Sequence, residues 1–392
     1  MRVAFLLQDL QLSGGVGVVV QHAVHLRRDH GVEVALVVTR PSQDESWAYP
    51  GLDELELLSV EDAAQRSWDL AVSSWWETNF SLFRLDAARH VSFVQLMEDS
   101  TYEAGTPERL GAAMTTALPV TFITEARWIA ALLADLQPGA PVHYVPNGVD
   151  KEAFPLVASP DPLDGPLRIV VEGSSEYVQK GVADALRATS MMSEPAHVTW
   201  VSPHPVSHPN GVDELHCALS HREFADVLSK SHVLLKLSRA EGMYGPPLEG
   251  FHRGCTVVTT PVTGHDEYVR HRENGLVTGW DDLHGTARAL DLLARDRDLL
   301  DDLRRGALQT ASEWPGWPEA AGRMAETLQA IAADPPPDGR GAGLRLASDI
   351  QTAIDDVEFA SWRAESAMDV YKDLRGQKAV RGALKLRRML KR

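Results

Sequence analysis

The 392-residue sequence has only two cysteines, Cys217 and Cys255. Two thiols cannot build a disulfide framework or a cysteine-rich zinc site, and both fit a reducing compartment. The sequence also lacks any apolar run of about 18 residues or more, which argues against a membrane-spanning helix. Its first residues, MRVAFLLQDL, lack the apolar core and the cleavage site of a signal peptide. We therefore expect a cytoplasmic protein.

Basic residues are scarce. The chain has 38 Lys and Arg against 55 Asp and Glu, which gives a net charge of -17. Binding to nucleic acid requires a basic surface that can contact the phosphates. We therefore expect no nucleic acid as a partner.

The segment 375–392 is the exception to this acidic balance, because it has eight basic residues and no acidic one. Val380, Leu384 and Leu390 would lie near one side of a helix formed by this segment. A basic amphipathic helix can lie on an anionic membrane surface, and each charge contributes on the order of 1 kcal/mol. A solvated tail is an equally weighted interpretation.

The apolar pattern predicts an α/β protein with two domains. Residues 1–150 open with a strand, a glycine loop, a helix and a second strand, which is typical of a doubly wound parallel sheet. The Pro- and Asp-rich segment 151–166 predicts a hinge, and residues 167–334 repeat the alternation. The segment 335–343 predicts a linker, and residues 344–392 predict a helical extension ending in the basic tail. Ligands of such sheets bind beyond the carboxyl ends of the strands, so we expect a site in a cleft between the domains.

The stretch 236–261 carries the clearest functional pattern. VLLKLS predicts a buried strand, Gly242 and Gly245 bracket a turn, two prolines can open a helix, and TVVTT predicts the next strand. This order places Glu241 just past a strand and Glu249 about two helical turns further along. The backbone amides between them, together with the helix N-terminus, can face an anion outside the sheet.

The segment EGMYGPPLE, from Glu241 to Glu249, resembles the E-x7-E motif of the retaining glycosyltransferases of family 4. This family has the GT-B fold, in which two Rossmann-like domains face a cleft. The resemblance implies that Glu241 faces the donor sugar and that Glu249 accepts hydrogen bonds from the ribose hydroxyls. It also implies that backbone amides between them contact sugar and phosphates, at Gly242, Met243, Tyr244 and Gly245. The alternative is a surface turn with two solvated glutamates.

Further segments resemble the same family. Gly14 and Gly15 follow the first strand, at the place of a Gly-Gly loop that lets the backbone approach the donor diphosphate. Lys180 matches a Lys-Gly pair, which implies that its ammonium neutralises the leaving pyrophosphate. PNGVD (146–150), GHDE (264–267) and NGLV (274–277) also match. The resemblance implies that residues 1–150 form the acceptor side, that 167–334 bind the donor, and that a helix near 317–334 crosses back.

Each of these matches has an alternative. The first glycine loop could belong to a dinucleotide-binding fingerprint, but its third glycine is missing and no acidic residue ends the second strand. Lys180 could be an exposed lysine at the start of a helix.

Two positions depart from the family pattern. Ser174 stands where the family usually has an Arg after the strand's glycine, so one phosphate partner is altered, and Arg239 or His204 could compensate. Gln95 and Glu98 lie in FVQLMED, where many members have a His that contacts the hydroxymethyl group of the donor sugar. This pattern is similar to a rhamnosyltransferase-like branch. Because a 6-deoxy sugar has no hydroxyl for such a His, we hypothesise a deoxysugar donor with both side chains lining the cleft.

These observations predict a retaining, metal-independent glycosyltransferase with Glu241 and Lys180 as its catalytic residues. We expect it to move a hexose or deoxyhexose from a nucleotide-diphosphate sugar to a hydroxyl of a glycan, glycolipid or natural-product acceptor. The sugar nucleotide is a co-substrate, so no cofactor is expected. No D-x-D motif ends a strand, and we therefore expect no catalytic metal. If the basic tail binds the inner membrane face, the acceptor can be lipid-linked. The alternative function is a non-catalytic sugar-nucleotide-binding or scaffold protein.

Overall fold

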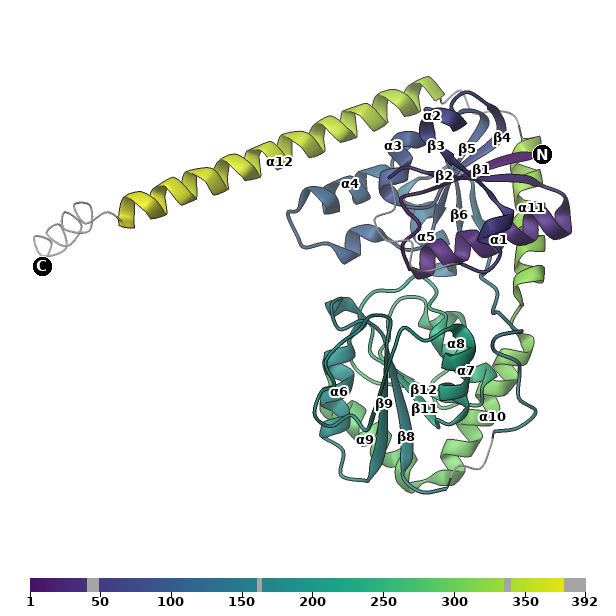
Figure 1. Cartoon of the computed structure of the whole chain (residues 1–392), viewed down its shortest axis with the longest axis vertical. Helices are drawn as coiled ribbons and strands as arrows, with labels where there is room; N and C mark the ends of the chain where they lie inside the picture. Colours follow the sequence, from purple (N-terminus) through teal and green to yellow (C-terminus); the bar gives the residue numbers. More distant parts are fainter. Residues whose placement is uncertain (41–48, 161–163, 335–339, 377–392) are drawn as a thin grey trace, which may run out of the picture.

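The computed structural model describes residues 1–40, 49–160, 164–334 and 340–376. It contains two parallel sheets that lie in separate halves of the molecule (Figure 1). The basic tail predicted to bind membranes lies outside the described residues from position 377 onward.

The N-terminal domain is built on a seven-stranded sheet with the order β3-β2-β1-β4-β5-β6-β7. All its strand pairs are parallel, so helices connect successive strands across both faces. Strands β1 and β4 are buried along most of their length because helices cover both sides. The elements are β1 (Arg2–Leu7), α1 (Gly14–His30), β2 (Glu33–Val38), η1 (Leu52–Glu54), β3 (Glu56–Ser59), α2 (Val60–Ala63), β4 (Ser67–Ser73), η2 (Trp76–Thr78), α3 (Asn79–Leu82), β5 (Asp86–Val94), η3 (Glu98–Thr101), α4 (Pro107–Thr115), β6 (Thr121–Thr124), α5 (Arg127–Leu136) and β7 (Val142–Tyr144).

The C-terminal domain is built on a six-stranded parallel sheet with the order β10-β9-β8-β11-β12-β13. The chain order reverses between β8 and β11, which are neighbours in the centre of the sheet. Open α/β sheets bind ligands at such a switch point, beyond the carboxyl ends of the strands. The elements are β8 (Leu167–Glu172), η4 (Val178–Lys180), α6 (Val182–Ser190), β9 (Ala196–Ser202), β10 (Glu214–Cys217), α7 (His221–Ser229), β11 (Val233–Lys236), α8 (Pro246–His252), β12 (Thr256–Thr259), η5 (His265–Glu267), β13 (Gly275–Val277), α9 (Leu283–Arg295) and α10 (Arg297–Glu313).

Helix α11 (Trp317–Ala333) returns from the C-terminal domain and packs along α1 of the N-terminal domain (Figure 1). The ring of Trp317 meets the buried ring of His22 edge to face, with centroids 5.3 Å apart. The guanidinium of Arg89 donates a hydrogen bond of 3.1 Å to the carbonyl of Ile331. These contacts attach the last helix of the two-domain core to the first domain.

Helix α12 (Arg340–Gly376) packs its first turns against α3 and α4 and then extends away from the molecule (Figure 1). Ala347, Ile350 and Ile354 are buried in this contact. The linker predicted at 335–343 is therefore too long, because the helix begins at Arg340. A Cβ on Gly343 would come within 2.2 Å of the ring of Phe83, so this glycine provides close packing rather than a helix break.

Candidate functional site

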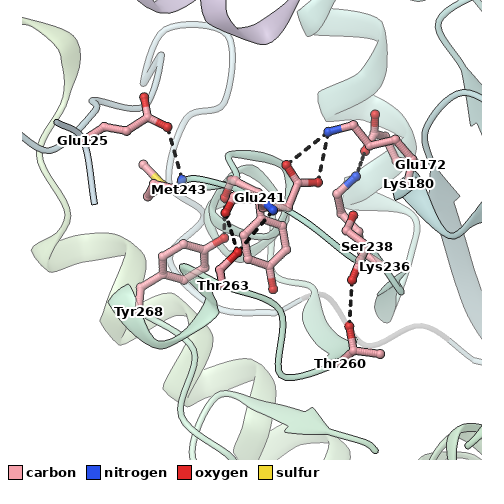
Figure 2. Close-up of polar contacts among 11 residues, drawn as sticks. Glu125, Glu172, Lys180, Lys236, Ser238, Glu241, Met243, Thr260, Thr263 and Tyr268 are labelled. Atoms are coloured by element: carbon pink, nitrogen blue, oxygen red, sulfur yellow. Dashed lines mark hydrogen bonds and ion pairs between the residues drawn. The ribbon is translucent and has the colours of Figure 1, made fainter. Parts of the chain in front are cut away.

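Glu241 lies in the glycine-rich turn beyond the carboxyl end of β11, at the switch point of the second sheet (Figure 2). The hydroxyl of Thr263 donates a hydrogen bond of 2.7 Å to the carbonyl of Glu241 and accepts one of 3.4 Å from its amide. This pair of bonds joins the turn to the segment that follows β12. The turn that carries Glu241 is therefore fixed from two strands.

Lys180 and Glu241 form an ion pair at this end of the sheet. The ammonium lies 3.0 and 3.1 Å from the two carboxylate oxygens (Figure 2). The side chain of Lys180 is 36% exposed and that of Glu241 is 10% exposed, so the lysine forms the open side of the pair. Lys180 ends η4, and the amide of Arg239 donates to the carbonyl of Gln179 at 2.7 Å, which holds this segment against the end of β11.

Gly181 explains how the Lys180 segment approaches the strand so closely. Its φ is 68°, and a Cβ there would lie 2.0 Å from the carbonyl oxygen of Leu237. Only glycine fits both conditions. The Lys-Gly pair is thus one structural unit, in which the glycine permits the contact and the lysine supplies the charge.

A second ion pair lies beside the first. The ammonium of Lys236, at the end of β11, donates a 2.6 Å hydrogen bond to a carboxylate oxygen of Glu172, at the end of β8 (Figure 2). Burial alone would raise the pKa of Glu241, but the charges of Lys180 and Lys236 outweigh burial and lower its pKa below the usual value. Glu241 is therefore ionised at neutral pH. No sequence motif pointed to Lys236 or Glu172 as site residues.

Gly242 brings the N-terminal domain into contact with the turn. A Cβ on Gly242 would lie 1.7 Å from the carbonyl oxygen of Gln95. The indole nitrogen of Trp128, in α5, donates a hydrogen bond of 3.0 Å to the carbonyl of Gly242. Both domains therefore contribute to the site, and their contact leaves no room for a larger residue at position 242.

Glu125 is a further site residue that the sequence analysis missed. Its carboxylate accepts hydrogen bonds from the amide of Met243, at 3.1 Å, and from the side chain of Asn147, at 2.6 Å (Figure 2 draws the first). Burial, the largest cause, raises the pKa of Glu125 to about 8, although both hydrogen bonds lower it. One amide of the E-x7-E turn therefore has a protein partner from the other domain, whereas the resemblance implied that it contacts the ligand.

Glu267 makes a further polar contact between the domains. Its carboxylate accepts hydrogen bonds from the amide and the guanidinium of Arg127, at 2.5 and 2.7 Å, and from the hydroxyl of Tyr144, at 3.1 Å. The side chain of Glu267 is 2% exposed. The segment GHDE thus connects the two domains in this structure.

Glu249 lies on α8 and is partly buried. Burial is the largest cause, and the charge of Glu172 the next, of a rise in its pKa to about 8. Among the described residues, none donates a hydrogen bond to its carboxyl group. A protonated carboxyl can donate as well as accept, so Glu249 can pair with a hydroxyl-bearing ligand in either direction.

Met243 and Tyr244 contribute only their backbones to the site, because both side chains are buried in the core. The hydroxyl of Tyr244 lies 3.0 Å from the hydroxyl of Thr259, and the carbonyl of Tyr244 accepts a bond of 2.5 Å from the hydroxyl of Tyr268. Gly245 directly precedes α8. These contacts fix the path of the turn between the two glutamates.

Gly14 and Gly15 were predicted to lie in a loop, but they lie in the first turn of α1. The side chain of Ser13 accepts a hydrogen bond from the amide of Val16 and caps the helix, so the helix begins at Gly14 and includes both glycines. The side-chain Nε2 of Gln95 donates a hydrogen bond of 3.2 Å to the carbonyl of Gly15. Gln95 therefore connects this helix start to the end of β5.

Ser174 is 5% exposed, and its hydroxyl accepts a hydrogen bond of 3.2 Å from the amide of Glu176. Arg239, a suggested substitute for the usual arginine, forms ion pairs of 2.8 and 2.5 Å with Asp184 and Asp281. The positive charges beside Glu241 come instead from Lys180 and Lys236.

Glu98 starts η3 and lines a small pocket of the N-terminal domain with the indoles of Trp75 and Trp76. Burial raises the pKa of Glu98 to about 8. Gln95 does not line this pocket but contacts Gly15 and approaches Gly242. The two residues predicted to line one cleft together thus have different neighbours.

No cluster of three or more metal-ligating side chains occurs within the part of the chain that the structure describes. Within the same ranges, no helix is both long and apolar enough to cross a membrane.

Residues 166–296 match the family model of the group 1 glycosyl transferases. The structure is similar to sucrose-phosphate synthase from Thermosynechococcus elongatus, with 14% identity and a TM-score of 0.70 over 85% of this chain and 100% of that chain. It is also similar to Anabaena HepE in complex with UDP and glucose, with 15% identity and a TM-score of 0.66 over 84% and 100%. The lipopolysaccharide outer core galactosyltransferase WaaB has 11% identity and a TM-score of 0.63 over 83% and 99%. Comparison with curated proteins gives no match. The chain has the GT-B fold, as predicted.

Proposed function

We propose that this protein is a retaining, metal-independent glycosyltransferase of family 4. It moves a hexose or deoxyhexose from a nucleotide-diphosphate sugar to a hydroxyl of a glycan, glycolipid or natural-product acceptor. The observation that carries this proposal is the Lys180–Glu241 ion pair, which lies at the switch point of a domain that matches the group 1 glycosyl transferases. The site is closed from the other side by the N-terminal domain, whose Gln95 backbone approaches Gly242.

Each site residue has a defined task in this reaction. Lys180 is the partly exposed cation, so its ammonium can contact the diphosphate and neutralise the charge that develops as the leaving bond breaks. Glu241 is ionised and can stabilise the electron-poor sugar carbon. Glu249 binds the ribose hydroxyls through a carboxyl group that no described residue occupies. The acceptor hydroxyl attacks the face from which the diphosphate leaves, and a departing phosphate oxygen takes its proton.

Bound donor must compete with Glu125 for the amide of Met243. A carboxyl group next to a diphosphate is unfavourable while it is ionised, and the raised pKa of Glu125 lowers this cost at neutral pH. Opening of the two domains releases this amide, and closure over the donor then excludes water.

The deoxysugar preference rests on the residues that replace the histidine common in the family. The side chain of Gln95 bonds to Gly15, and Glu98 lies in the pocket with Trp75. Among the described residues, neither side chain forms a hydrogen bond or ion pair with the turn that carries Glu241, so the hydroxymethyl group of an ordinary hexose lacks a dedicated partner. The indole of Trp75, which lines the small pocket with Glu98, can stack on a sugar ring of the acceptor.

A panel of nucleotide sugars with coupled detection of the released nucleotide tests the function. We expect release with deoxysugar donors, the same anomeric configuration in donor and product by NMR, and full activity in chelator. Turnover only with glucose or N-acetylglucosamine nucleotides would refute the deoxysugar preference, and loss of activity in chelator would refute metal independence. Binding of a donor in native mass spectrometry without any release would favour the scaffold function.

A membrane surface is the proposed partner of the C-terminal extension. In the part of α12 that extends from the molecule, Phe359 and Trp362 are 57% and 61% exposed, and their rings stack with centroids 5.9 Å apart. The segment 375–392, which follows, has eight basic residues and no acidic one. Exposed aromatic rings next to a basic segment fit the interface of an anionic bilayer.

Removal of the residues after Gly376 should release the protein from anionic vesicles in a sedimentation assay, while donor turnover on a soluble acceptor persists. Vesicles of neutral lipid should bind neither form. If the full chain remains in solution with anionic vesicles, or if truncation only changes the oligomeric state, the membrane proposal is wrong.

A further inference from the structure

Lys236 is a buried lysine in the centre of the second sheet. It ends β11, only 3% of it is exposed, and its ammonium bonds to Glu172 at the end of the neighbouring strand β8. The register pairs Leu235 with Val171. Lys236 and Glu172 are the next residue on each strand, so they lie side by side at the switch point. An isolated buried ammonium would be costly, and it is tolerated here because carboxylates surround it.

The charge of Lys236 acts on more than its direct partner. Burial would lower the pKa of Lys236, but Glu172, Glu241 and Glu249 raise it, and the lysine stays charged. Glu241 and Glu249 are the two glutamates of the E-x7-E segment. Lys236 is thus a buried positive charge whose field reaches both ends of the motif.

The end of the second sheet that carries the site would be anionic without this lysine. Three carboxyl groups, those of Glu172, Glu241 and Glu249, accompany only two ammonium groups. Because Glu249 is largely protonated at neutral pH, the two lysines balance the remaining two carboxylates. Removal of one lysine would leave an excess negative charge where the diphosphate must bind.

We propose that Lys236 is a positioning residue of the donor site. Its buried ammonium, bonded to Glu172 at 2.6 Å beside the Lys180–Glu241 pair, cancels the negative charge of Glu172, so that Lys180 remains available to the diphosphate. This inference rests on the proposed function, because it assigns the anion that the site accepts. Lys236 also supplies the second positive charge that Ser174 does not provide.

The position of Lys236 in the chain connects it to the segment that carries Lys180. Leu237, the next residue, contacts Gly181 through its carbonyl, so the end of β11 supports the segment of Lys180. Lys236 therefore lies under the backbone that positions the exposed cation. Because Lys236 is buried and bonded to Glu172, its ammonium cannot turn toward solvent, and its charge stays at one place.

Other titratable groups around Glu241 must be included in any pH argument. These groups are Lys180 on η4, Lys236 on β11, Glu125 after β6, Tyr244 in the turn and Tyr268 after η5. The two lysines favour the ionised form of Glu241. The wild-type carboxylate is therefore lost only at a pH below its usual range, and removal of Lys236 moves this loss upward.

The test compares Lys236→Met, Glu172→Gln and the double variant in the full-length chain, with inorganic pyrophosphate as the probe in titration calorimetry. We expect Lys236→Met to weaken pyrophosphate binding at least about tenfold. Glu172→Gln removes a negative charge and should strengthen binding. The double variant has the wild-type net charge and no buried unpaired carboxylate, but it should still bind more weakly than Glu172→Gln. Arg295→Met, which removes a surface ion pair with Glu194, is the matched control.

The pH profile of kcat/KM provides the second readout. The acid limb should move upward by about one pH unit in the double variant, because Glu241 loses one of the two charges that hold it ionised. Wild-type affinity and an unshifted acid limb in a folded double variant would overturn the proposal and restrict Lys236 to a structural role. Pyrophosphate binding with the expected order but no turnover of any donor by the wild type would refute the glycosyltransferase function and leave the anion site intact.

Discussion

Glu241→Ala should lower kcat/KM for the preferred donor by about 10²–10³-fold, the loss typical of removing one preorganised electrostatic contact. The sugar carbon becomes electron-poor as the diphosphate leaves, and the carboxylate of Glu241 is the negative charge that the glycine turn presents. Its removal also leaves the ammonium groups of Lys180 and Lys236 without this partner. Released nucleotide, measured over a range of donor concentrations, gives kcat and KM separately.

Glu241→Gln keeps the size of the side chain and a hydrogen-bond acceptor for Lys180 but removes the charge. We expect a similar loss from this variant, mainly in kcat. Glu273→Ala removes an exposed carboxylate outside the site and is the control. Circular dichroism melting verifies that each variant is folded. A Glu241→Gln variant with wild-type kcat would show that the charge of Glu241 has no part in the reaction.

The strands that carry the site could be predicted because they are buried on both faces. VLLK and TVVT are continuous apolar or β-branched runs, and they form β11 and β12 at the centre of the second sheet. The edge strands β3 and β10 were missed. Both have four residues, none of which is fully buried, and their sequences, ELLS and ELHC, show neither a long apolar run nor regular alternation.

Two of the proposed site residues stand in short sequence motifs that can be read without knowing the fold. Glu241 and Lys180 were identified from motifs, and the structure brings them into an ion pair. Glu125, Glu172 and Lys236 were missed, because each gains its partner from a distant part of the chain. A charged residue that ends an apolar strand, such as Lys236 after VLL, was the available signal. Charge pairing across neighbouring strands can be recognised only after the strand order is known.

The contact between the domains depends on glycines at two positions of the closed site. Gly264 has a φ of 80°, and a Cβ there would lie 1.7 Å from the carbonyl oxygen of Gly242. Gly242 in turn faces the carbonyl of Gln95 and the carboxylate of Glu125. Three backbone segments thus meet with no side chain between them. This approach brings the two domains into direct backbone contact at the turn that carries Glu241.

Gly242→Ala should therefore lower kcat at least about a hundredfold, because a displacement of about 1 Å at a reacting centre costs that much. The new methyl group would lie 1.7 Å from the Gln95 carbonyl oxygen and 2.9 Å from a Glu125 oxygen, so the N-terminal domain must move back. Pyrophosphate should still bind, since Lys180 and Lys236 belong to the other domain. Gly250→Ala is the matched control, because its Cβ would make ordinary contact, 3.5 Å from Cys255. Wild-type turnover by Gly242→Ala would show that the closed contact is not needed for catalysis.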